Sequence, residues 1–197
     1  MKRGVVFLCI LAMVLTSGCA TNPELIKTAG IGTRTDIFQE LTVGSPVPLG
    51  YADLRIVSSL KTHNPGLYSL EKKSHGTPDY KLLINIDGQV AEIAGVLREE
   101  DSEPRGLRDP EAGEGIRYSF RKEVRIKAGT HRIVIAIPED NIAVERNLKL
   151  KEGSVNILVL EPIYGSTSPT GRPTYYSPTA FMSGVDGFRL ILNGSLL

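Results

Sequence analysis

The stretch that decides the fold is YKLLINIDGQVAEIAGVL, residues 80–97. Its first half places apolar side chains at every second residue, namely Tyr80, Leu82, Ile84 and Ile86. A period of two is typical of a β-strand that buries one face. Asp87-Gly88 follows at once, and an Asp-Gly pair between two such runs is the strongest short-range signal for a hairpin. The stretch therefore predicts two antiparallel strands joined by a two-residue turn.

The same alternation recurs on both sides of this hairpin. Further strands are expected at residues 51–61, 116–127, 131–137, 142–151, 155–160 and 188–192. Turn-forming residues separate several of them: Ala128-Gly129-Thr130, Pro138-Glu139-Asp140-Asn141 and Glu152-Gly153. Short strands with turn residues every 8–12 or so positions are typical of antiparallel sandwiches. We expect residues 36–197 to form an all-β, antiparallel β-sandwich of about seven to nine strands.

The N-terminus has the composition of an export signal. Lys2 and Arg3 supply positive charge, and Gly4–Thr16 is almost wholly apolar. This run is shorter than the roughly 20 apolar residues of a membrane-spanning helix, but it fits the signal-peptide core of about 7–15 residues. Residues 1–18 are therefore expected to be a signal peptide.

The segment Leu15-Thr16-Ser17-Gly18-Cys19 resembles the lipobox of bacterial lipoprotein signal peptides. In that family a small residue precedes the cysteine, which becomes the first, acylated residue of the mature chain. The family usually has Leu three positions before the cysteine, where this chain has Thr16. The resemblance implies a lipid anchor on Cys19. An ordinary cleaved signal with a chance cysteine, or a retained anchor helix, are the alternatives.

The resemblance also bears on location and chemistry. In similar lipoproteins of two-membrane cells, Asp after the cysteine tends to retain the protein in the inner membrane. Ala20 therefore favours the outer membrane, with the domain facing the periplasm. Cys9 would leave with the signal, so the mature chain would have no disulfide and no thiol nucleophile. The formal net charge of +1 gives no reason to expect nucleic acid as a partner.

Residues 19–35 are polar, small and glycine-containing, and we interpret them as a lipidated tether. A short helical turn can begin at Asn22-Pro23-Glu24, because Asn is a good N-cap and Pro suits the first helical position.

A second resemblance covers residues 116–164. Lys127-Ala128-Gly129-Thr130-His131, Pro138-Glu139 and Lys151-Glu152-Gly153 resemble the turns of PEGA-like and other immunoglobulin-like or transthyretin-like modules of bacterial envelope proteins. The chain departs from the defining tetrapeptide, because Asp140-Asn141 stands where the family has Gly-Ala. The resemblance implies a spacer, an adhesion element or a binding surface rather than an enzyme.

Two insertions interrupt the strands, at 99–115 and 162–187. The first is acidic, and its carboxylates could bind Ca²⁺, which prefers oxygen ligands. The candidate metal ligands are Glu99, Glu100, Asp101 and Glu103. No EF-hand spacing is present, and the alternative is a solvated loop that keeps a sheet edge soluble.

The second insertion is rich in Gly, Pro, Ser, Thr and Tyr. Tyr and Arg are favoured at interface hot spots, and the candidate partner-binding residues are Tyr164, Arg172, Tyr175, Tyr176 and Phe181. The alternative is that these rings pack back over the sandwich as a lid.

Catalytic signals are weak. His63 and His75 flank a loop and could approach each other, but neither has a second ligand at metal-binding spacing, and no nucleophile-elbow sequence occurs. No cofactor is expected. The sequence predicts a non-enzymatic envelope lipoprotein that binds or spaces a protein partner in an assembly. The alternatives are loop-mediated binding of a small ligand, glycan or metal ion, and an enzyme with a cleft at His63 and His75.

Overall fold

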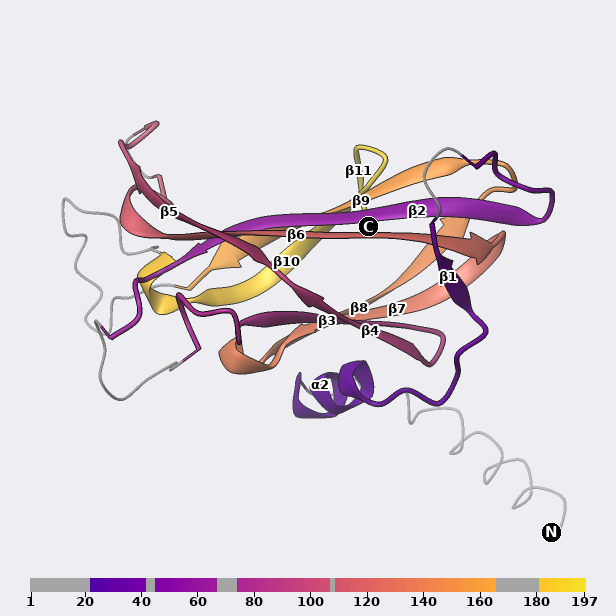
Figure 1. Ribbon diagram of the computed structural model, residues 1–197, viewed down its shortest axis with the longest axis horizontal. Helices are drawn as coiled ribbons and strands as arrows, with labels where there is room; N and C mark the ends of the chain where they lie inside the picture. Colours follow the sequence, from indigo (N-terminus) through magenta and orange to yellow (C-terminus); the bar gives the residue numbers. More distant parts are fainter. Residues whose placement is uncertain (1–21, 42–44, 67–73, 107–108, 166–180) are drawn as a thin grey trace, which may run out of the picture.

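Eleven strands form two sheets in the part of the chain that the computed structural model describes, residues 22–41, 45–66, 74–106, 109–165 and 181–197 (Figure 1). The larger sheet contains β1 (Phe38–Glu40), β2 (Tyr51–Thr62), β5 (Val96–Ser102), β6 (Gly113–Lys127), β9 (Val155–Tyr164), β10 (Val185–Leu192) and β11 (Ser195–Leu196). The smaller sheet contains β3 (Lys81–Ile86), β4 (Gln89–Ala94), β7 (Gly129–Ile137) and β8 (Ile142–Leu150). The predicted all-β fold with two sheets is confirmed.

The two sheets have separate strand orders and share one core. The larger sheet runs β1-β6-β2-β9-β10-β11, with β5 also paired to β6, and the smaller runs β4-β3-β7-β8. Alternate residues of both sheets point inward and form one shared core. Ile84 and Ile135 of the smaller sheet, and Leu54 and Tyr118 of the larger, are at most 1% exposed. Burying such a side chain contributes about 1.5–3 kcal/mol before its ordering entropy is subtracted.

The predicted hairpin at Asp87-Gly88 is confirmed. Ile86 pairs with Gln89, so the turn has two residues, and both have positive φ, 47° and 95°. This is the backbone of the hairpin turn that twisted strands favour. The Asp87 carboxylate also accepts a hydrogen bond from the backbone N–H of Arg132 at 2.8 Å, which ties the turn to β7.

The prediction of a purely antiparallel sandwich is wrong at one place. β2 and β9 lie side by side in parallel, with Val57 opposite Val159. The chain reverses direction three times, between β6 and β7, between β7 and β8, and between β8 and β9. Because β2 is antiparallel to β6, β9 therefore runs the same way as β2 in the larger sheet. The described residues also hold more strands than the seven to nine expected, because β1, β5 and β11 were not anticipated.

The N-terminal segment differs from the expected tether. The predicted helical turn is confirmed as α2 (Asn22–Gly30), whose Leu25 and Ala29 pack on Val134 and Ala136 on the outer face of the smaller sheet. No helix in the described ranges is long and apolar enough to cross a membrane. The described part of residues 19–35 is therefore not a free tether but belongs to the domain (Figure 1).

Both insertions are shorter than predicted. β5 continues through Glu99 to Ser102 and β6 begins at Gly113, so much of 99–115 is strand. β9 extends to Tyr164, a 3-10 turn η2 occupies Phe181–Ser183, and β10 begins at Val185. Residues 166–180 of the second insertion lie outside the described residues.

Gly95 is where the chain passes from the smaller sheet to the larger, between β4 and β5. A Cβ at this position would lie 2.8 Å from the ring of Tyr118 and 3.0 Å from that of Phe120. These two rings are stacked with their centroids 5.8 Å apart, so neither can move aside without disturbing the other. Only glycine fits this crossing.

We therefore predict that Gly95→Ala lowers the free energy of unfolding by about 1–3 kcal/mol through overpacking. Gly106→Ala is the matched control, because nothing lies within 4 Å of its added Cβ. Urea unfolding followed by circular dichroism measures both. Equal stability of the two variants would show that the rings yield to the added methyl group.

Candidate functional site

The loops that follow β2, β5 and β9 all emerge at one end of the domain, on the left of Figure 1, which we call the loop end. The 3-10 turn η1 (Pro138–Asp140) between β7 and β8 lies at the same end. Lys61, His63, His75 and Asp140 lie here, so the loop end is a candidate functional site.

Asp140 is the centre of a buried polar cluster at the loop end. Its carboxylate accepts hydrogen bonds from His75 Nε2 at 2.8 Å, from the Tyr80 hydroxyl at 2.7 Å and from the backbone N–H of Val185 at 2.9 Å. The side chains of His75 and Asp140 are both 0% exposed. Burial, and secondarily the neighbouring Asp140 charge, raise the pKa of Tyr80, which therefore stays protonated and donates.

The predicted approach of the two histidines is confirmed, with ring centroids 4.7 Å apart. However, His75 is 0% and His63 3% exposed. One nitrogen of each ring already has a partner, Asp140 for His75 and the carbonyl of Asn64 for His63. The pair is therefore part of the core and presents no imidazole to solvent.

Lys61 carries a buried ammonium group that no sequence pattern predicted. Its Nζ donates to Ser102 Oγ and the Glu111 carbonyl, each at 3.1 Å, and to the Gly113 carbonyl, and it lies 4.9 Å from the centroid of the Phe181 ring. Burial lowers its pKa. Because these acceptors belong to the connection between β5 and β6, Lys61 fastens that connection to β2.

Glu100 and Glu111 are held by Arg117 on the neighbouring strand. Arg117 Nη2 lies 2.7 Å from Glu100, and its Nη1 lies 2.7 Å from Glu111. The hydrogen bond from Arg117 is the largest cause that lowers the pKa of Glu100 to about 2. The Tyr164 hydroxyl donates to Glu111 and accepts the backbone N–H of Lys61 at 2.8 Å, so the network reaches β9 as well.

The structure does not bring the four predicted calcium ligands together. Alternation along β5 sends Glu100 toward Arg117, while Glu99 and Asp101 are exposed and Glu103 lies beyond the strand. Throughout the described ranges, no group of three or more His, Cys, Asp and Glu side chains is arranged to hold a metal ion. A strand cannot direct successive residues to one ion, because their side chains point to opposite faces.

The partner-binding prediction is wrong for the two residues that can be located. Tyr164 is 8% and Phe181 2% exposed, and both pack into the core. For these two rings the alternative, packing back over the domain, holds. Arg172, Tyr175 and Tyr176 lie outside the described residues, and so does Cys19.

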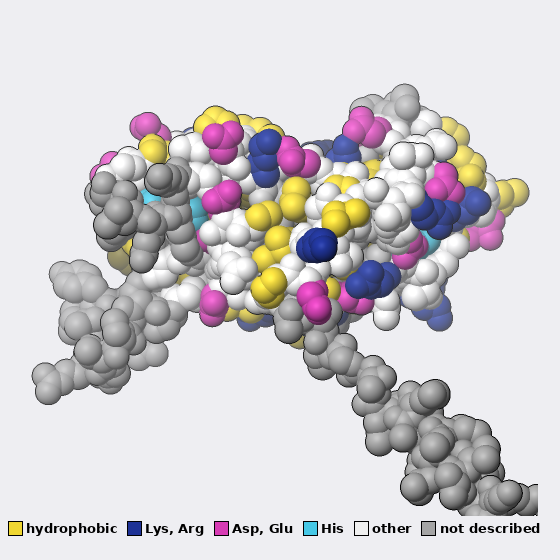
Figure 2. All heavy atoms as spheres, turned by 90° about the horizontal axis from the view of Figure 1, so that it is seen from below, with side chains coloured by type: hydrophobic (Ala, Val, Ile, Leu, Met, Phe, Trp, Pro, Cys, Tyr) yellow, Lys and Arg dark blue, Asp and Glu magenta, His cyan; other side chains and the backbone are white. Residues whose placement is uncertain are grey.

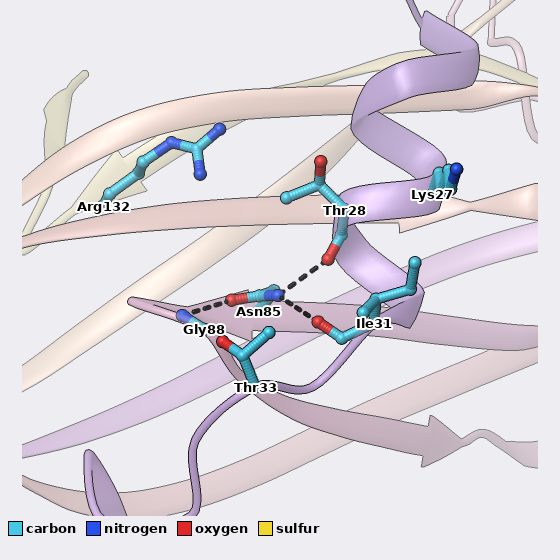
Figure 3. Close-up of a pocket in the computed structure, with 7 residues that line it drawn as sticks. All are labelled: Lys27, Thr28, Ile31, Thr33, Asn85, Gly88 and Arg132. Carbon is cyan, nitrogen blue, oxygen red and sulfur yellow. Dashed lines mark hydrogen bonds between the residues drawn. The ribbon is translucent and has the colours of Figure 1, made fainter.

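A shallow pocket of about 300 Å³ lies beside the C-terminal end of α2 (Figure 3). Its main polar groups already have partners within the chain. The Asn85 amide donates to the carbonyls of Thr28 and Ile31, and the Arg132 guanidinium forms two hydrogen bonds with Glu145. On the same side of the molecule, acidic and basic side chains are intermixed (Figure 2). The pocket therefore has no concentrated charge with which to select a ligand.

The outer face of the larger sheet carries an exposed apolar surface, which we call the β9 face. It consists of the exposed residues Val155, Ile157, Val159, Ile163 and Leu196 and the half-buried residues Val57 and Ile191. Val155 is 66%, Ile157 42% and Leu196 69% exposed. Leu158 and Leu160 fill the core from the other side of β9, so this strand is apolar on both faces. A strand with one solvated face normally alternates apolar and polar residues.

The pairing register makes the β9 face continuous. Val57 on β2 lies opposite Val159 on β9, Val159 opposite Ile191 on β10, and Ile191 opposite Leu196 on β11. This row crosses four strands. The ion pair of Arg189 with Glu161, at 3.1 Å, separates Ile163 from the rest of the face, and on the β2 side Arg55 and Arg121 pair with Glu123. Sequence reasoning missed the surface, although the apolar run VNILVL at 155–160 was its signal.

No known protein family matches the chain, and no curated protein or solved structure matches it either. The geometry of the described residues is therefore the basis for any functional conclusion.

The low pKa of Glu100 makes a prediction about acid stability. Its folded-state pKa of about 2 is below the ordinary value of 4.5, so the Arg117 interaction stabilises the fold above pH 4.5 and is lost as the pH falls toward 2. Glu100→Gln should therefore lower the free energy of unfolding at pH 7 by about 1–2 kcal/mol, after allowance for partial exposure.

The difference between Glu100→Gln and the unsubstituted chain should shrink between pH 4.5 and about 2. Glu99→Gln is the control, because Glu99 is an exposed neighbour on the opposite side of β5. Denaturant titrations across this pH range measure the effect. A constant difference at every pH would contradict the assigned role of the Glu100 charge.

Proposed function

We propose that this chain is a lipid-anchored envelope protein that serves as a non-enzymatic binding module, and that the β9 face is its contact surface. The observation that carries the proposal is the exposed apolar row across four strands. Contiguous apolar patches of this kind on a soluble domain mark interaction sites, because leaving them in water is unfavourable. A protein assembly partner would cover the face.

The proposed anchor on Cys19 is compatible with a free β9 face. Only two residues separate Cys19 from Asn22, so the reach between them is three residue steps, about 10 Å. Asn22 begins α2, which lies on the outer face of the smaller sheet, and its amide contacts the Asn141 carbonyl at the loop end. The lipid surface would therefore meet the domain near that corner. The β9 face is on the opposite sheet (Figure 1).

We also propose that the domain is of the immunoglobulin-like or transthyretin-like type found in PEGA-like envelope modules. Two facing sheets and the turn residues at 127–131 and 151–153 support this assignment. Within that proposal the outer membrane, with the domain in the periplasm, is the location that Ala20 favours. Binding of a small ligand, glycan or metal ion has weaker support, because Asn85 and Arg132 of the α2 pocket are already paired.

The anchor predicts a change of cell fraction. Cys19→Ser removes the thiol that the acyl chains require, and one or more chains at about 0.8 kcal/mol per buried methylene would be lost from the membrane attachment. The variant should appear in the soluble fraction or as an uncleaved precursor. Cys9→Ser is the control and should leave the protein in membranes. If Cys19→Ser stayed in membranes at its mature mass, the anchor would be elsewhere.

The contact surface predicts a change of assembly size. Ile157→Glu places a charge at the centre of the β9 face, so the complex that contains this chain should shrink on native gels of detergent-solubilised membranes. Ala94→Glu introduces the same charge at an exposed position of β4 and should change nothing. Melting curves would verify that both variants fold. An unchanged complex with Ile157→Glu would rule out the β9 face as the contact.

A further inference from the structure

We infer that the partner on the β9 face is a second copy of this chain, so that two domains pack sheet against sheet around Val159. This inference rests on the proposed function, since it names the occupant of the same surface. Three properties of the face support a second copy: its area, the charges around it, and its position relative to the end of the domain where Asn22 begins α2.

The area is sufficient for a specific contact. Four strands spaced by about 4.8 Å, and a β9 strand that rises about 3.3 Å per residue over 155–163, give a footprint of roughly 500 Å² on each copy. Two copies would then bury about 1,000 Å² in total, which is the size at which a biological interface begins. Two identical twisted sheets also have matching curvature and can pack in the aligned manner of sandwiches, about 10 Å apart.

The charges around the β9 face are compatible with contact between two copies of the chain. On one side Arg189 pairs with Glu161, and on the other Arg55 and Arg121 share Glu123. The first border is neutral, and the second has one excess positive charge. A strongly acidic or basic partner would find little complementary field, whereas in a contact with a second copy each Glu161 brings its own Arg189. Such a contact is isologous, the commonest arrangement in homodimers.

The two-fold axis also agrees with the proposed anchor. An axis that runs along the strands, in the plane of the contact, places Val159 against Val159 of the other copy and Val57 near its Ile191. The same axis keeps both loop ends on one side. Both Asn22 corners then face one membrane, and the two copies stand side by side on it.

The position of Val159 on this axis allows a direct test. Val159→Cys in the full chain, treated in its own membranes with a bismaleimide crosslinker that spans about 10 Å, should become linked between copies, because residues on the axis face each other across the two packed sheets. The expected result is a band of twice the chain mass that appears only when the crosslinker is added. Ala94→Cys, exposed on the smaller sheet, is the control and should stay at the mass of one chain.

Each outcome decides the question. A doubled band with Val159→Cys alone supports the second copy. Absence of the doubled band, while Ile157→Glu still shrinks the native complex, overturns the second copy and leaves the β9 face as a contact for a different protein. A doubled band with both cysteine variants indicates random collision and also overturns the inference. Absence of the band together with an Ile157→Glu complex of unchanged size overturns both the inference and the proposed function.

Discussion

The carboxylate of Asp140 joins three separate segments at the loop end and holds the two sheets together there. It accepts hydrogen bonds from the His75 ring, from the Tyr80 hydroxyl just before β3, and from the N–H of Val185 at the start of β10. The carboxylate thus connects the smaller sheet to the larger. Because it is fully buried, its charge must be met by all of these donors, and losing one leaves an unsatisfied group in the core.

The hydrogen bonds and ion pairs at the loop end bury its polar side chains and so limit which surfaces can contact a partner. Together with Lys61 and Arg117, Asp140 turns the versatile side chains of this end inward. The histidines, Tyr164 and Phe181 become structural. The surface that the described residues present to a partner is instead the apolar β9 face. Among the described residues, the β9 face is therefore the surface best suited to binding a partner.

Local pattern predicted the local structure well. The alternation in residues 80–86 and the Asp87-Gly88 pair were sufficient for the hairpin, because both its strands and its turn are encoded within one short stretch. The parallel pairing of β2 with β9 was not predictable, since the partners lie about 100 residues apart and nothing local selects them. Glu100 was misjudged for the same reason: its partner Arg117 is on another strand. α2 was underestimated because only two of its side chains, Leu25 and Ala29, are buried.

The central claim is that the β9 face, and neither the loop end nor the α2 side, meets the partner in the membrane. Photo-crosslinking in intact cells tests it most directly, with the photoreactive residue placed in turn at Ile157, at the exposed loop-end residue Glu103, and at Glu92 on the outer face of β4. We predict protein crosslinks from position 157 and none from 103 or 92. Crosslinks from 103 or 92 with none from 157 would contradict the account.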